Sequence, residues 1–309
     1  MVHIIPRDKV RHLEWKPGQE VPPGPDFSKP VIPTPPIGIT GSDFNFTIDD
    51  ILKGKIFKSE KKDESGNYIG LAVALKEALE YANTVNGFIA TMPELIAAKL
   101  KASVDHDFWE NGCDVHTEEN IGIDKKGRFY TKDEPVLVVV NGGGILTPPR
   151  IFKAYEDGLI DNSARYSDQE FDDLLDGKLA DGTSIQLHKF EDIKNGISDL
   201  PHRFGVVMPY SMAQNTESGY FNKTDFMNNP LVIARAAELE NLEAYFERAK
   251  DTDDDTLGNH HPFNGRDAST PQGRVLVLYN YCIGLIGNCN LGYIGRFVVV
   301  APEALDAKK

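Results

Sequence analysis

Residue types suited to a contact surface are concentrated in one segment near the C-terminus. The stretch from Tyr279 to Ile294 contains only Tyr, Asn, Cys, Ile, Gly and Leu, and it holds two of the three cysteines. Tyrosine and asparagine offer large contact areas and adaptable hydrogen bonds at a modest entropic cost, as they do in antibody paratopes. This composition therefore favours binding over catalysis.

The spacing of leucine and glycine divides this segment and its flanks into two sets. We expect the leucines to point inward and the glycines to form backbone turns, so that both hold the segment in place. The expected scaffold residues are Leu278, Gly284, Leu285, Gly287, Leu291, Gly295 and Arg296. The expected ligand-contacting residues are Tyr279, Asn280, Tyr281, Cys282, Ile283, Ile286, Asn288, Cys289, Asn290, Gly292, Tyr293 and Ile294.

The genetic code gives this restricted composition a possible origin. Random replacement of both adenines in an AAY asparagine codon produces an NNY codon. Such codons never encode Lys, Glu, Gln, Met or Trp, and they never give a stop. Every residue from Tyr279 to Ile294 is compatible with this code. The alternative is a plain loop rich in Gly and Asn, or an irregular strand pair with a buried Ile and Leu core.

Other groups with chemical potential favour structural roles. The NGGG at 141–144 follows an expected strand, but it lacks the spacing of a dinucleotide fingerprint and has no GK[ST], so we interpret it as a glycine turn. The acidic run DTDDD at 251–255 lacks the ligand spacing of an EF-hand. Neither motif predicts a cofactor or a metal site.

Histidines near these motifs also give no catalytic or metal-binding pattern. Adjacent histidines, here His260 and His261, point in different directions on an extended chain and rarely bind one metal together. His202 precedes a strand that ends near Ser211, but no nucleophile elbow surrounds the serine. We therefore predict no catalytic residues in this chain.

Charge and composition limit the classes of partner. The net charge is −14 and the pI is near 5.0, which argues against nucleic acid because phosphate binding needs clustered Lys and Arg. Three cysteines do not describe a disulfide scaffold. We expect no signal peptide in MVHIIPRDKVRHLEW and no membrane span, because no apolar run is long enough.

The elements that must position the C-terminal segment follow from periodicity. Residues 1–40 form a Pro-rich arm, and 41–309 form one domain with a polar insertion near 145–230. Helices are expected at 68–86, at 93–102 with Thr91 as N-cap, and at 230–250. Strands are expected from Pro135, Phe204, Arg274 and Arg296, and a loop at 251–273.

The segment from Tyr279 to Ile294 resembles the variable region of proteins diversified by retroelements, known as diversity-generating retroelements. In that family, adenine-directed mutagenesis rewrites the codons of a C-terminal binding surface carried on a C-type lectin fold. The resemblance implies an α+β protein with two helices, small antiparallel sheets and insertions. It also implies a protein or cell-surface ligand, no cofactor, and display on a cell surface or virion.

A second segment, from Ala74 to Leu100, resembles the two-helix part of C-type lectin folds of the formylglycine-generating-enzyme type. The matching residues are Glu77, Ala78, Tyr81, Gly87, Thr91, Glu94, Ala97 and Ala98. The GGSW and GFR signatures of bacterial members are absent, which suggests an archaeal variable protein.

Two further functions remain as alternatives. An oxidase of the formylglycine-generating class would use a cysteine pair such as Cys282 and Cys289, but no Lys or His flanks them to lower a thiol pKa. A calcium-dependent sugar-binding lectin would carry Glu-Pro-Asn or Trp-Asn-Asp motifs, and neither is present.

Overall fold

The structure is a computed structural model of the chain. It describes residues 46–196, 201–251, 254–261, 263, 265–279, 284–286 and 291–301. All of these belong to one compact unit, Thr34–Lys309. The expected Pro-rich arm at 1–40 lies outside the described residues.

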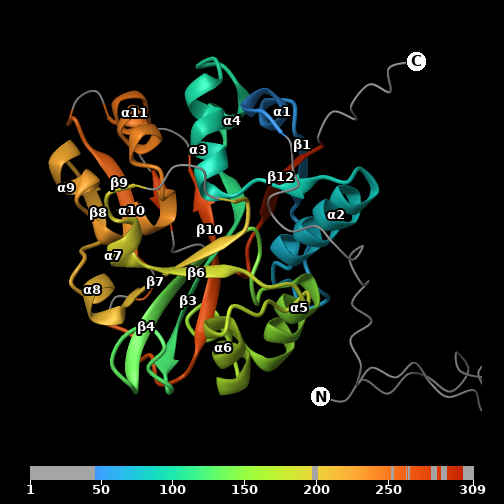
Figure 1. The fold of residues 1–309 in the computed structure, drawn as a ribbon. Coiled ribbons are helices and arrows are strands. Elements are labelled where there is room, and N and C mark those ends of the chain that lie inside the picture. Colours follow the sequence, from blue (N-terminus) through green and yellow to red (C-terminus); the bar gives the residue numbers. More distant parts are fainter. Residues whose placement is uncertain are drawn as a thin grey trace, which may run out of the picture. The chain divides into compact units, whose positions relative to one another are not determined.

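The described strands join in one twelve-stranded sheet, not in several separate small sheets as the resemblance implied. Its main path runs β6-β7-β4-β3-β10-β11-β9-β8, and β3, β4 and β10 lie side by side through the middle of Figure 1. Along this path most neighbours are antiparallel, whereas β6 with β7 and β9 with β11 are parallel. The strands of the main path are β3 (Cys113–Asp124), β4 (Glu134–Asn141), β6 (Gln186–Lys189), β7 (Phe204–Pro209), β8 (Gly219–Phe221), β9 (Leu257–His260), β10 (Gln272–Leu278) and β11 (Leu285–Ile286).

Four further strands attach to this path. β12 pairs with β1, β2 and β3, and β5 pairs with β10. Their bounds are β1 (Lys55–Ser59), β2 (Phe88–Ile89), β5 (Ala164–Arg165) and β12 (Gly295–Val300). β12 therefore brings the end of the described chain to the strands near its beginning.

The two helices expected near the N-terminal side of the domain are confirmed as α2 (Gly70–Thr84) and α3 (Met92–Lys101). α2 packs along β1 and β12 through its apolar face (Figure 1). Thr91 is the N-cap of α3, and its N–H donates to Glu94 Oε2 at 2.8 Å, as a capping box requires.

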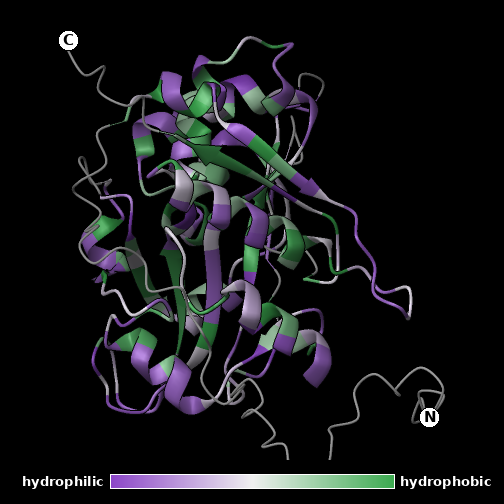
Figure 2. Ribbon diagram, turned by 90° about the vertical axis from the view of Figure 1, so that its right-hand side faces the viewer, coloured by the Kyte–Doolittle hydropathy of each residue, from purple (hydrophilic) through white to green (hydrophobic). Residues whose placement is uncertain are grey.

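Further helices cover the rest of the sheet, and green and purple stretches alternate along several of them in Figure 2, as expected for helices with one buried face. They are α1 (Ile48–Leu52), α4 (Asp107–Glu110), α5 (Pro148–Asp157), α6 (Asp168–Leu175), α7 (Phe190–Ile193), α8 (Tyr210–Gln214), α9 (Lys223–Met227), α10 (Pro230–Ala236) and α11 (Leu239–Ala249). α5 to α9 lie within the polar insertion expected near 145–230.

The structure corrects the helix expected over 230–250. That helix is broken into α10 and α11 at Ala237, whose φ is +58°. Its amide still donates to Ile233 O at 2.8 Å, but the next amide, that of Glu238, donates to Ala236 O and turns the chain. The break lets α10 bury Arg235 while α11 packs on α3.

Of the twelve described strands, only β4, β7, β10 and β12 were predicted from the sequence, and the unpredicted β9 and β3 matter most for the site. The expected loop at 251–273 contains β9, which pairs with β8 and β11. The central strand β3 was not predicted at all, because its sequence CDVHTEENIGID is too polar to give a strand pattern. β7, which falls inside the expected insertion, pairs with β4 in the main sheet.

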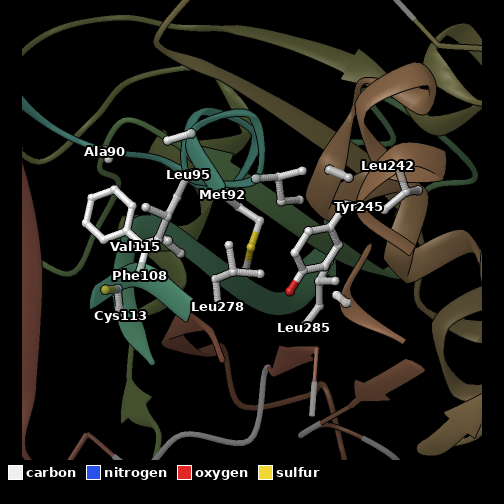
Figure 3. Packing of buried hydrophobic residues seen from close by; sticks show 14 of the residues in the cluster. Ala90, Met92, Leu95, Phe108, Cys113, Val115, Leu242, Tyr245, Leu278 and Leu285 are labelled. Carbon is white, nitrogen blue, oxygen red and sulfur yellow. The ribbon is translucent and has the colours of Figure 1, made fainter. Parts of the chain in front are cut away.

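One of the hydrophobic clusters includes residues at the adjoining ends of β10 and β11. Figure 3 shows Met92 and Leu95 of α3, Leu242 and Tyr245 of α11, and Leu278 and Leu285 of β10 and β11 around one core. Leu278 and Leu285 are fully buried there. The ends of β10 and β11 are therefore fixed by packing against two helices.

Candidate functional site

The 279–294 segment connects β10 to β12. β11 turns back against β10, with Val277 paired to Ile286 and Leu278 to Leu285. The Tyr279 amide donates to Gly284 O at 3.0 Å and closes the turn between the two strands. Several expected site residues lie outside the described residues: Asn280, Tyr281, Cys282, Ile283, Gly287, Asn288, Cys289 and Asn290.

The first residue of the segment is held from below by a buried lysine. Lys99 of α3 donates its Nζ to the Tyr279 carbonyl oxygen. Its ammonium also lies 5.1 Å from the centre of the Trp109 ring, while Trp109 Nε1 donates to Lys99 O at 3.0 Å. Burial lowers the pKa of Lys99 to about 7.

Gly284 forms a turn that needs glycine. Its φ is +71°, in the left-handed region, and a Cβ at this position would lie 2.1 Å from Gly258 O. This close approach allows β11 to pair in parallel with β9, Leu285 opposite Asn259 and Ile286 opposite His260. The backbone of the segment at Leu285 and Ile286 thus becomes part of the sheet.

Arg235 connects this part of the sheet to the core. Its Nε donates to Glu119 Oε1 at 2.6 Å and its Nη2 to Glu119 Oε2 at 3.0 Å, with both side chains fully buried. The same guanidinium donates to Leu285 O at 3.3 Å and to His260 O at 3.1 Å. One side chain therefore fixes the main chain of both β9 and β11.

The second half of the segment is held at Leu291. This side chain is fully buried in a cluster with Leu71, Leu75 and Phe297. Its amide donates to the carbonyl oxygen of residue 162 at 3.3 Å, and its own carbonyl oxygen accepts a bond from Tyr155 Oη at 2.6 Å. Leu291 is thus held both by its side chain and by its main chain.

The last residues of the segment lie on the N-terminus of α2. The Leu71 amide donates to Tyr293 O at 3.0 Å, whereas the Tyr293 side chain is 49% exposed. Gly292 and Ile294 are partly exposed. A Cβ on Gly295 would lie 2.6 Å from Leu71 Cα, so glycine permits the contact between β12 and the helix.

Arg296 closes the arrangement at the start of β12. Its amide donates to Asp114 Oδ2 at 2.6 Å, and its guanidinium donates to Gly112 O at 3.1 Å and contacts Asp107 and Cys113 Sγ. Burial raises the pKa of Asp114 to about 7 and that of Cys113 to about 11. The thiol is therefore neutral near pH 7 and unsuited to act as a nucleophile.

The sequence did not predict the residues of other helices and strands that bond the 279–294 segment and hold it in place. Lys99, Tyr155 and Asp114 carry no local signal, because their partners lie far along the chain. Arg235 carried a weak signal, a lone charge in the apolar run PLVIARAA. A charged residue in such a run must find a partner when it is buried.

The other sequence motifs have structural contacts. Gly142 and Gly143 have φ of +82° and +92°, and the glycine turn presents the amides of Ile145 and Leu146 to the Glu118 carboxylate at 2.6 and 3.0 Å. Burial raises the pKa of Glu118 to about 7. The glycine turn at 141–144 therefore directs main-chain amides toward the Glu118 carboxylate.

The histidines are likewise placed within the fold. His202 Nδ1 lies 2.7 Å from Glu94 Oε1, and Ser211 is an exposed residue of α8. His261 is buried, which lowers its pKa to about 4, and burial also lowers the pKa of His260. In the described ranges, no group of three or more His, Cys, Asp or Glu side chains could hold a metal ion.

Comparison with known proteins identifies the fold. No protein-family model and no curated protein matches the sequence. The chain is similar to a solved structure described as "Accommodation of massive sequence variation in Nanoarchaeota by the C-type lectin fold", with 24% identity and a TM-score of 0.58 over 79% of this chain and 96% of that chain. The expected α+β, C-type lectin fold is therefore confirmed. Across the residues that the structure describes, no helix is long and apolar enough to cross a membrane.

Proposed function

We propose that this protein is a ligand-binding display protein whose 279–294 surface is diversified by adenine-directed retroelement mutagenesis. One observation carries the proposal: where the structure describes the segment, its fully buried side chains are leucines, and main-chain atoms make the hydrogen bonds described above. The Tyr293 side chain remains 49% exposed while its carbonyl oxygen is bonded to α2. Replacement of such side chains leaves the fixed contacts intact.

The similar solved structure supports this proposal. That protein is described as accommodating massive sequence variation with the same fold. Under the proposal, the twelve expected contact residues from Tyr279 to Ile294 bind a protein or cell-surface ligand, and the protein is displayed on a surface. The identities of the present residues then carry less information than their positions.

The first test is genetic. The proposal expects a near-identical repeat of the 279–294 codons near the gene, with AAY at the contact positions, next to a reverse transcriptase. Sequencing of the surrounding DNA decides this. Absence of both the repeat and the reverse transcriptase would sink the retroelement part of the proposal.

The second test is a selection with the full chain displayed on yeast. One library places NNY codons at the expected contact positions, and a matched library places them at Leu278, Gly284, Leu285 and Leu291. We expect the first library to stay folded and to yield binders to a probe protein such as lysozyme. The second should lose folded protein, because it removes buried leucines and a left-handed glycine. Equal loss in both libraries contradicts the proposal.

A further inference from the structure

A hairpin next to the 279–294 segment is held rigidly by its own contacts. The Ile69 amide donates to Lys61 O at 2.9 Å, and Lys62 and Tyr68 form an antiparallel bridge. At the tip, Asp63 Oδ1 accepts the amides of Ser65 and Asn67 at 2.8 and 2.9 Å. Because the turn is preorganised, a ligand would lose little free energy in ordering it.

This hairpin touches the 279–294 segment at Tyr293. The rings of Tyr68 and Tyr293 are 5.9 Å apart between their centres, at an angle of 48°. At the base, a Cβ on Gly70 would lie 2.3 Å from Ser59 O and 3.2 Å from Tyr293 O. The hairpin therefore contacts the segment through the Tyr68 and Tyr293 rings, and the main chains of Gly70 and Tyr293 approach closely at its base.

Lys62 places a positive charge beside Tyr68, on an exposed hairpin that also carries Lys61, Asp63 and Glu64. Its Nζ lies 4.2 Å from the centre of the Tyr68 ring, and its side chain belongs to the exposed part of the hairpin, 61–67. Within the described part of the chain, no carboxylate forms an ion pair with Lys62. An ammonium held over an aromatic ring can accept a carboxylate from outside while the ring contacts apolar atoms beside it.

We infer that Lys62 and Tyr68 form a fixed contact of the proposed binding surface, in addition to its variable residues. The partner that fits is a protein surface with an Asp or Glu side chain next to an apolar one. This inference rests on the proposed function, because it needs a ligand at the 279–294 segment. It assigns part of the binding energy to residues that retroelement mutagenesis would not change.

The experiment uses full-chain binders selected from the NNY contact library against two probe proteins, acidic serum albumin and basic lysozyme. Lys62→Gln and Tyr68→Leu are then introduced into several independent binders of each probe. For albumin binders, we expect Lys62→Gln to weaken binding about fivefold and Tyr68→Leu about tenfold. For lysozyme binders, only Tyr68→Leu should weaken binding.

Lys61→Gln is the matched control, because Lys61 is equally part of the exposed hairpin and carries the same charge but makes no ring contact in the described structure. It should change affinity less than about twofold. Equal effects of Lys62→Gln and Lys61→Gln on albumin binders would overturn the inference, as would unchanged affinity of the Tyr68→Leu variants. A contact library that yields no binders to either probe overturns the proposed function itself, and the inference with it.

Discussion

Lys99 is a titratable side chain in an apolar part of the molecule. It is fully buried near Trp109, and its pKa is lowered to about 7 because burial disfavours the charged form. The lysine provides a donor for the Tyr279 carbonyl oxygen at the start of the 279–294 segment. A partly buried carbonyl without a donor would itself destabilise the fold, which offsets the cost of burying the lysine.

The pH dependence of stability should reveal this cost. Between about pH 7 and pH 10, the unfolded chain binds a proton at Lys99 that the folded chain does not bind, so stability rises with pH by up to about 1.4 kcal/mol per unit. Below about pH 7 this contribution is constant. Lys99→Met removes the titrating group. The difference in free energy of unfolding between wild type and variant, measured with urea at several pH values, should therefore change with pH by this slope. Parallel pH profiles for the two proteins would contradict the lowered pKa.

At the scale of elements, the central strand β3 is held by polar pairs instead of apolar packing alone. Thr117 Oγ1 donates to Asn141 Oδ1 at 2.7 Å, Glu118 accepts two amides of the glycine turn, and Glu119 pairs with Arg235. Each bond crosses to another element. β3 therefore fixes the relative positions of β4, the 141–144 turn and α10.

Replacement of Arg235 by Met should be strongly destabilising. It leaves the Glu119 carboxylate buried without its guanidinium and removes the donors to Leu285 O and His260 O. We expect a loss of about 3–5 kcal/mol in the free energy of unfolding. The control is Lys223→Met, which breaks exposed ion pairs with Glu243 and Glu247 and should cost much less. Urea unfolding measures the free energy of unfolding of both variants. Equal losses would show that the buried Arg235 network stabilises the fold no more than the exposed ion pairs of Lys223 do.

The same polar pairing explains which elements could be predicted from the sequence. Helices α2 and α3 and strands β4, β7, β10 and β12 have apolar periodicity or Val-rich runs that local patterns reveal. β3 was missed because four of its buried polar side chains find partners far along the chain: Asp114, Thr117, Glu118 and Glu119. The break at Ala237 was missed because it serves tertiary contacts of Arg235, which outweigh helix propensity.

The candidate site was predictable in part, for a related reason. Composition and spacing alone pointed to the 279–294 segment and to its leucines, and Leu278, Leu285 and Leu291 are all fully buried. No sequence pattern could show that Lys99, Tyr155 and Leu71 hold its main chain, because such bonds depend on three-dimensional proximity.

At the scale of the whole molecule, the contacts that stabilise the fold and the side chains offered to solvent are different sets. Leu291 is buried among core residues and bonded through its own amide and carbonyl, whereas Tyr293 places only its main chain against α2. The two residues are neighbours in the same segment. Replacing each of them therefore compares a side chain that stabilises the fold with one that is exposed to solvent.

Leu291→Ala should lower the free energy of unfolding by about 2–5 kcal/mol, because it leaves a cavity between β12 and α2. Tyr293→Ser should change it by about 1 kcal/mol or less, because an exposed ring is lost and the Leu71 bond remains. Urea unfolding of the full chain measures both variants under one set of conditions. A loss for Tyr293→Ser as large as that for Leu291→Ala would mean that the exposed ring supports the fold. The 279–294 segment could not then vary its side chains without loss of structure.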